Sequence, residues 1–298
     1  MPTLENVIVV VNEEPYCFWS TNARGENQEY LCSIDGTYFQ SIGNLVIEGF
    51  AKEDGSKSHV STLLRLTYYH ALETFFSHIC AMLQAPDCVV GWVQKASNQD
   101  IRNVVRKIDE KDNSIKRTLD IKEISWESLA RSILQVSDTD EHRVEANIKN
   151  FSCFWSRIAS EYLRPEAAHE YNAMKHGFRV RSGGFQLLFG REMEPGKPPE
   201  MDKMKTLTQS DYGSSYFKAE QCSAKSGKNR SYYLKRFSIN WSFEATLAKL
   251  MIVSGSITNV MGFLKILNGV PREQVKWGPS LFRVGNRRYR LAGISAGG

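Results

Sequence analysis

The stretch HEYNAMKHGFRVRSGG, residues 169 to 184, marks the point where the sequence changes its periodicity. Before it, from about Glu141 to His176, apolar residues recur at the spacing of a helix, with one interruption at Pro165. After Gly177, polar and apolar residues alternate as in strands, in the segments GGFQLLFG, SSYFKAEQC and RSYYLKRFSI. The sequence therefore predicts two successive helices up to Gly177 and a small antiparallel β insert after it.

Two further segments have the pattern of long core helices. Residues 58 to 84 contain neither Gly nor Pro, and their apolar residues follow the helical period until Pro86. Residues 240 to 267 form a second apolar run, for which Asn240 is the expected N-cap and Gly269 the expected C-cap. These helices, together with residues 145 to 176, are expected to form the core.

The predicted fold is mainly α, a helical bundle core with a small antiparallel β insert, and α+β overall. Shorter helices are expected over 98–110 and over 124–134, the latter with Ser125 as its N-cap. The expected parts, in one compact domain, are an N-terminal arm with short strands (1–55), a helical core (56–182 and 239–269), the β insert (183–238) and a basic C-terminal segment (270–298). Strands are expected at Val7 to Val11 and in TYFQSIGNLVIEGF, and short N-terminal strands and the C-terminal YRLAGI are candidates to join the insert's sheet.

The composition is that of a soluble globular protein, with 42% hydrophobic and 24% charged residues in 298. The apolar run near the N-terminus is too short for a membrane span and lacks the basic lead-in of a signal peptide. Six cysteines without C-x-x-C spacing are expected to be free thiols, with Cys80 and Cys153 as small apolar residues of helices. These features predict a cytoplasmic protein that is not bound to a membrane.

The positive charge is concentrated at the C-terminal end. Residues 270 to 298 hold six basic residues and one acid, so this segment carries the whole formal net charge of +5. Near its end, Arg287, Arg288 and Arg290 flank Tyr289. Such a segment can bind a phosphate backbone and stack on bases, and it can equally be a solvated edge strand guarded by arginines.

A polar stripe is expected at the end of the helix that precedes Gly177. His169, Asn172 and His176 lie at positions i, i+3 and i+7, and therefore project from one face. The cations that accompany this stripe are Lys175, Arg179 and Arg181. His can act as general acid or base, Asn can position a substrate, and Lys and Arg can hold a phosphate. The alternative is that Asn and His cap the helix and bind the backbone of the strand that follows.

The pattern N-x-x-x-H followed by Gly resembles the signature of the HEPN superfamily (higher eukaryotes and prokaryotes nucleotide-binding). Asn172 and His176 match the polar residue and the His of that motif, and Tyr171 stands where the family has Arg. The resemblance implies an all-α protein and a metal-independent RNase or RNA-binding protein of bacterial defence or toxin systems. It implies that Asn172 and His176 act in the catalysis of a homodimer. From the stripe itself we expect His169 to join them as a catalytic residue and Lys175, Arg179 and Arg181 to bind RNA.

His70 and Glu73, one turn apart on the first core helix, are expected to support this site. Glu73 is expected to form an ion pair with His176 or Lys175, or to be the carboxylate that orients the catalytic His. A di-iron site would need two E-x-x-H motifs, and the sequence has one, at Glu166 and His169. No phosphate-binding or dinucleotide-binding glycine motif is present. The sequence therefore predicts no metal and no cofactor.

Two functions remain open. One is an RNA-binding or RNA-cleaving protein that acts as a homodimer. The other is a non-catalytic interaction or scaffold protein that binds a protein partner through the β insert and the basic tail. Solvent access to the polar stripe separates them, because a sealed stripe leaves no room for a substrate.

Overall fold

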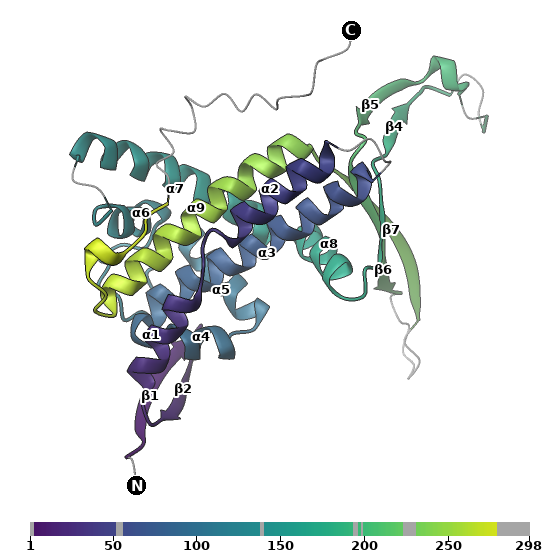
Figure 1. Ribbon diagram of the computed structural model, residues 1–298. Helices are drawn as coiled ribbons and strands as arrows, with labels where there is room; N and C mark the ends of the chain where they lie inside the picture. Colours follow the sequence, from purple (N-terminus) through teal and green to yellow (C-terminus); the bar gives the residue numbers. More distant parts are fainter. Residues whose placement is uncertain are drawn as a thin grey trace. The chain divides into compact units, whose positions relative to one another are not determined.

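The computed structural model describes residues 3–51, 56–137, 140–192, 196–197, 199–222 and 231–278 (Figure 1). The fold is mainly helical with small antiparallel sheets, which confirms the predicted α+β class. The chain divides into two compact units. Unit 1 is formed from Met1–Ile42, His70–Arg164 and Leu250–Gly298, and unit 2 from Gly43–Tyr69 and Pro165–Lys249.

Unit 1 consists mainly of helices, with a short N-terminal hairpin. Its complete elements are β1 (Glu5–Val11), β2 (Glu14–Ser20), α1 (Ala23–Ser33), α4 (Val89–Lys95), α5 (Asn98–Asp109), α6 (Trp126–Leu134) and α7 (Glu141–Leu163), with 3-10 turns at Pro86–Cys88 and Arg272–Gln274. It also takes the start of α2 (Tyr38–Phe50), the later part of α3 (Lys57–Gln84) and most of α9 (Phe243–Leu267).

The core of unit 1 joins the helices that the sequence predicted as partners. The ring of Trp155 on α7 lies 5.3 Å from that of Phe75 on α3, and its indole Nε1 donates to Ser256 Oγ on α9 at 2.9 Å. All three side chains are buried, and the small serine lets the indole reach the helix. The predicted helix 124–134 is confirmed, since Ser125 caps α6 by accepting a hydrogen bond from the Ser128 amide.

Unit 2 combines the remaining helical segments with two small sheets. Its complete elements are α8 (Pro165–Lys175), β3 (Val180–Ser182), β4 (Gln186–Phe189), a 3-10 turn at Met201–Lys203, β5 (Lys205–Gln209), β6 (Gly213–Gln221) and β7 (Tyr232–Asn240). Pro165 opens α8 directly after α7 ends, as its missing N–H allows. The three strands predicted for the insert are confirmed as β4, β6 and β7.

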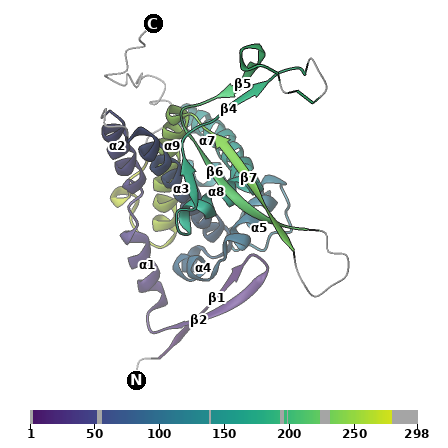
Figure 2. The same ribbon diagram turned by 90° about the vertical axis from the view of Figure 1, so that its right-hand side faces the viewer.

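The larger sheet of unit 2 has the strand order β3-β6-β7, so β7 is an edge strand of this sheet. Figure 2 shows β6 and β7 as one long hairpin, with β4 and β5 as a separate pair. One face of the sheet packs on helices. Ser182 binds Thr62 of α3, Ser214 is fully buried, and the Tyr216 hydroxyl donates to the Glu166 carbonyl of α8.

The segment TYFQSIGNLVIEGF is helical, and the prediction of strands there is wrong. It forms most of α2, whose buried residues Phe39, Gly43 and Val46 recur at i, i+4 and i+7. A short apolar run is compatible with either period, and here packing selects the helix. The strand at Val7 to Val11 is confirmed, but β1 pairs with β2 and does not join the insert's sheet. YRLAGI lies outside the described residues.

The N-cap expected at Asn240 is also wrong. Asn240 ends β7, and its side chain makes two hydrogen bonds with the backbone of Phe185, at 2.8 and 3.0 Å. Ser242 caps α9 instead by accepting from the Ala245 amide at 3.1 Å. The Asn side chain has both a carbonyl oxygen and an NH₂ group, so it can accept from and donate to the backbone of one neighbouring residue. Asn240 is used in this way, and the helix cap lies two residues later, at Ser242. The left-handed Gly269 beyond α9 is confirmed, with φ +85°.

Helix α9 is long and apolar enough to cross a membrane by length and composition, but 67% of its most apolar window is buried inside the protein. That burial is typical of the core helix of a soluble domain. The six cysteines are free, as predicted. Cys80 is buried, but Cys153 is exposed on α7, because its position falls on the outer face of that helix.

Candidate functional site

Helix α8 has a buried side and an exposed side. Ala167, Glu170, Tyr171, Ala173 and Met174 are buried. Asn172, Lys175 and His176 are exposed, and His169 is half-buried. The predicted polar stripe therefore opens to solvent at its C-terminal end. Tyr171, at the position of the family's Arg, points inward, where its ring lies 5.5 Å from that of Tyr69.

The buried side is held by an ion pair. Glu170 is 0% exposed, and its carboxylate accepts hydrogen bonds from Arg65 Nη2 at 3.1 Å, Tyr69 Oη at 2.5 Å and Ser214 Oγ at 2.8 Å. The guanidinium of Arg65 lies 4.5 Å from the Tyr69 ring and 5.2 Å from that of Trp241. A buried charge needs a partner, and these contacts supply one to each ion. The network thereby fixes α8 against α3 and β6.

The chain leaves α8 through a left-handed turn. Gly177, where the sequence predicted the end of the helix, has φ +82°, and Phe178 follows with φ +48°. The turn is closed by the amide of Arg179, which donates to the Ala173 carbonyl at 2.7 Å. A left-handed conformation costs a non-glycine residue about 1–2 kcal/mol. Phe178 is also 56% exposed, so burial of its ring does not offset this cost.

The exposed end of α8 forms what is called here the α8 cluster: Asn172, Lys175, His176, Phe178 and Arg179. Asn172 and His176 are one helical turn apart and share a face, as do Asn172 and Lys175. The cluster offers an imidazole, an amide, an aromatic ring and two cations to one ligand. Such groups can neutralise a phosphate, stack on a base and transfer a proton.

Phe178 was not among the residues that the sequence singled out. The one signal for it is the sequence HGF, which places an aromatic residue directly after the glycine that ends the helix. Arg181 is also exposed, and lies on β3, where it pairs with Ser215 of β6. The basic residues Arg287, Arg288 and Arg290 lie outside the described residues.

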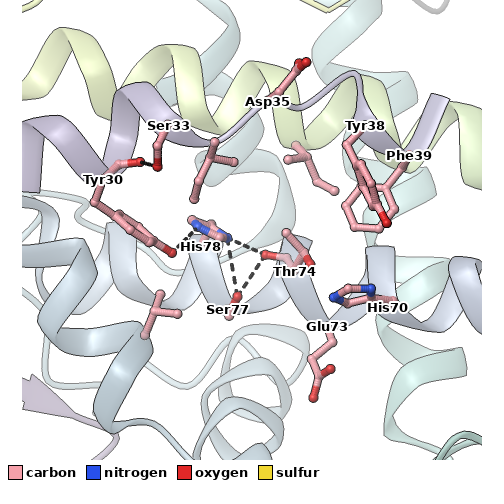
Figure 3. A pocket seen from close by; sticks show the side chains of 13 residues that line it. Tyr30, Ser33, Asp35, Tyr38, Phe39, His70, Glu73, Thr74, Ser77 and His78 are labelled. Carbon is pink, nitrogen blue, oxygen red and sulfur yellow. Dashed lines mark hydrogen bonds between the residues drawn. The ribbon is translucent and has the colours of Figure 1, made fainter. Parts of the chain in front are cut away.

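His70 and Glu73 belong to a different place, a pocket of unit 1 with a volume of about 490 Å³ (Figure 3). The exposed His70 ring lies edge-on to Phe39 at 5.4 Å. The remaining lining residues are Tyr30, Ser33, Ile34, Asp35, Tyr38, Thr74, Ser77, His78, Val93 and Ile257. Both predicted supporting residues are therefore part of this largely apolar pocket.

His78 lies at the floor of the pocket and was missed by the sequence analysis. Its Nδ1 lies 2.6 Å from the Thr74 carbonyl and its Nε2 lies 3.1 Å from the Tyr30 hydroxyl (Figure 3). Nδ1 therefore carries the proton, and Tyr30 donates to Nε2. Burial lowers the pKa of His78 and raises that of Tyr30 to about 12, so both rings are neutral at pH 7.

No family model, no curated protein and no solved structure matches the chain. In the part of the chain that the structure describes, no group of three or more His, Cys, Asp or Glu residues is placed to hold a metal ion.

Proposed function

We propose that the protein binds RNA at the α8 cluster and cleaves it, with His176 as a general acid–base. One observation carries this proposal: Asn172 and His176 share a solvent-exposed face beside Lys175, Phe178 and Arg179. The resemblance of Asn172 and His176 to the HEPN motif favours the same substrate. The six free cysteines are consistent with a cytoplasmic site of action.

Cleavage without a metal uses the RNA's own 2′-hydroxyl. Its oxygen attacks the adjacent phosphorus, the bond to the 5′-oxygen breaks, and the products are a 2′,3′-cyclic phosphate and a 5′-hydroxyl. One proton leaves the 2′-oxygen and one reaches the 5′-oxygen, and His176 would transfer one of these. Lys175 and Arg179 would neutralise the phosphate, and Asn172 would position it. A second copy of the cluster in a homodimer would supply the other proton transfer.

The test is His176→Ala, with His142→Ala as its matched control. Both histidines are exposed, and His142 lies on α7 in unit 1. Loss of a general acid–base lowers the rate by about 10²- to 10⁴-fold, while an exposed substitution changes the free energy of unfolding by less than about 0.5 kcal/mol. We expect His176→Ala to abolish cleavage at an unchanged melting temperature and His142→Ala to retain it.

Binding is measured separately with RNA whose 2′-oxygens are methylated, because such RNA cannot form the cyclic phosphate. We expect His176→Ala to bind this analogue with nearly wild-type affinity. A folded His176→Ala variant that still cleaves RNA would remove His176 from the catalytic step. If neither cleavage nor binding is found for the wild type, the proposal fails as a whole.

The second candidate function is a non-catalytic interaction protein, and the β4–β5 pair favours it. Leu187, Phe189 and Leu207 are exposed on these strands, and Met201 is exposed in the loop between them. Exposed apolar groups that gather on one element are typical of binding surfaces. Two results together would favour the interaction role: the wild-type protein does not bind RNA, and the double variant Leu187→Ser with Phe189→Ser no longer self-associates.

A further inference from the structure

The sheet β3-β6-β7 has an inner face on the helices and an outer face that is open. Residues that lie directly opposite one another on paired strands point to the same face. Ser182, Ser214 and Tyr216 define the inner face through their contacts with α3 and α8. The outer face then consists of Arg181, Gly213, Ser215, Phe217, Ala219, Gln221, Tyr232, Leu234, Arg236, Ser238 and Asn240. At its Asn240 end the face holds the backbone of Phe185, and the rest is open. The hydrogen bond between Ser215 and Ser238, at 2.7 Å, confirms that these two share it.

Three large apolar or aromatic side chains on the outer face are mostly exposed to solvent. Phe217 is 66% exposed, Tyr232 55% and Leu234 73%. Phe217 pairs with Arg236, Ala219 with Leu234 and Gln221 with Tyr232. Tyr232 lies opposite Gln221, which is four positions further along β6 than Phe217. The two aromatic rings are therefore offset by roughly 14 Å along the strand direction. The face therefore displays two separate rings with an aliphatic residue between them.

The charge of this face has one sign. Arg181 and Arg236 lie on it, and none of its described residues is acidic. Glu220, the acidic residue of β6, belongs to the inner face, where it accepts from the Tyr233 hydroxyl at 2.6 Å and lies 3.9 Å from Lys218 and from Lys235. A polyanion is the complementary ligand for a face with arginines and no acid.

We propose that the outer face of the sheet β3-β6-β7 is a platform on which single-stranded RNA lies, with bases stacked on Phe217 and Tyr232 and phosphates held by Arg181 and Arg236. This proposal rests on the proposed RNA binding and names the form of RNA that is bound. Exposed rings can stack only on bases whose faces are free, and a duplex hides those faces in its own stack. A protein partner would leave two arginines to be desolvated, whereas a nucleic acid pairs them with phosphates.

The experiment compares a short oligoadenylate with an abasic chain of equal length, both with methylated 2′-oxygens so that neither is cleaved. Phe217→Ala with Tyr232→Ala is measured against Trp19→Ala, an exposed aromatic of unit 1. Arg236→Gln is measured against Lys235→Gln, its neighbour on the inner face of the same strand. We expect each lost ring to weaken oligoadenylate binding by about 5- to 100-fold and to leave abasic binding unchanged. Arg236→Gln should weaken both chains, and both controls should bind as wild type.

Other results would overturn the platform. If the double variant binds oligoadenylate as wild type does, while Lys175→Gln with Arg179→Gln weakens binding, the platform is wrong and the α8 cluster stands. If wild type binds no RNA, both proposals fail. If the double variant lowers the native mass without affecting RNA affinity, the face is a protein interface. Ultraviolet crosslinking of wild type tests the same claim without a substitution, because Tyr232 should be crosslinked to the RNA, and its absence from the adducts would contradict the platform.

Discussion

The two sides of helix α8 use charge in opposite ways. On the buried side, Glu170 and Arg65 satisfy each other, and a tyrosine and a serine complete the carboxylate's hydrogen bonds. On the exposed side, the α8 cluster holds a histidine, two cations and a strained Phe178 in contact with water. The buried set is explained by folding alone. In the exposed set Lys175 lies over the ring of Tyr171 at 5.1 Å, whereas neither the strain of Phe178 nor the exposure of its ring stabilises the helix.

The difference separates residues that hold the site from residues that act in it. A buried ion pair contributes little net stability relative to an apolar pair, but removal of one partner leaves a charge without compensation. The Glu170 network therefore fixes the register of α8 against α3 and β6. Substitutions in it should change stability, and substitutions in the α8 cluster should change ligand binding.

The largest effect is expected for Glu170→Ala. This change leaves Arg65 buried without its carboxylate, so the free energy of unfolding should fall by about 3–5 kcal/mol. Glu166→Ala is the matched control, because Glu166 is exposed one helical turn earlier on α8 and should change stability by less than about 0.5 kcal/mol. Denaturant unfolding measures both. Equal, small losses for the two variants would show that the buried pair does not hold the helix.

The buried His78 should couple the stability of the fold to pH. Burial lowers the pKa of His78 below its ordinary value of 6.5. Below pH 6.5 the unfolded chain binds a proton at His78 more readily than the folded protein does, which favours unfolding. The contribution of His78 to the free energy of unfolding is therefore complete above pH 6.5 and is lost as the pH falls below that value. Its part of the slope is at most about 1.4 kcal/mol per pH unit.

Unfolding measured between pH 5 and 7, in steps, tests this coupling. His78→Gln should flatten the slope relative to wild type. Parallel slopes for wild type and His78→Gln would contradict the assignment of His78 as a buried neutral ring.

The smallest effect on stability is expected for Phe178→Gly. Glycine adopts the left-handed turn without the cost that phenylalanine bears, so the variant should be more stable by up to about 1 kcal/mol. It should also bind RNA more weakly, because a stacking ring is lost. Phe189→Gly, at an exposed phenylalanine of β4, should bring no gain in stability. A Phe178→Gly protein that is less stable than wild type would show that the turn is not strained.

The sequence predicted the elements whose signals are local. Long periodic runs ended by Pro86 and by Gly269 indicated α3 and α9, and Gly177 indicated the end of α8. Residues 37 to 50 were misread because a short apolar run satisfies both periods, and tertiary packing decides between them. Glu170 pairs with Arg65, which is 105 residues away in the sequence, so no local pattern predicts this pair. The exposure of Asn172 and His176 likewise depends on which side of α8 the sheet covers.

The central claim is that the α8 cluster binds RNA phosphates, and the salt dependence of affinity tests it most directly. Each phosphate contact on a single strand contributes about 0.7 to the slope of log affinity against log salt concentration. We expect Lys175→Gln with Arg179→Gln to flatten the slope for single-stranded RNA by about 1.4. Lys149→Gln with Arg157→Gln, the same charge change at exposed positions of α7, should leave the slope unaltered. Equal slopes for wild type and both double variants would contradict the claim.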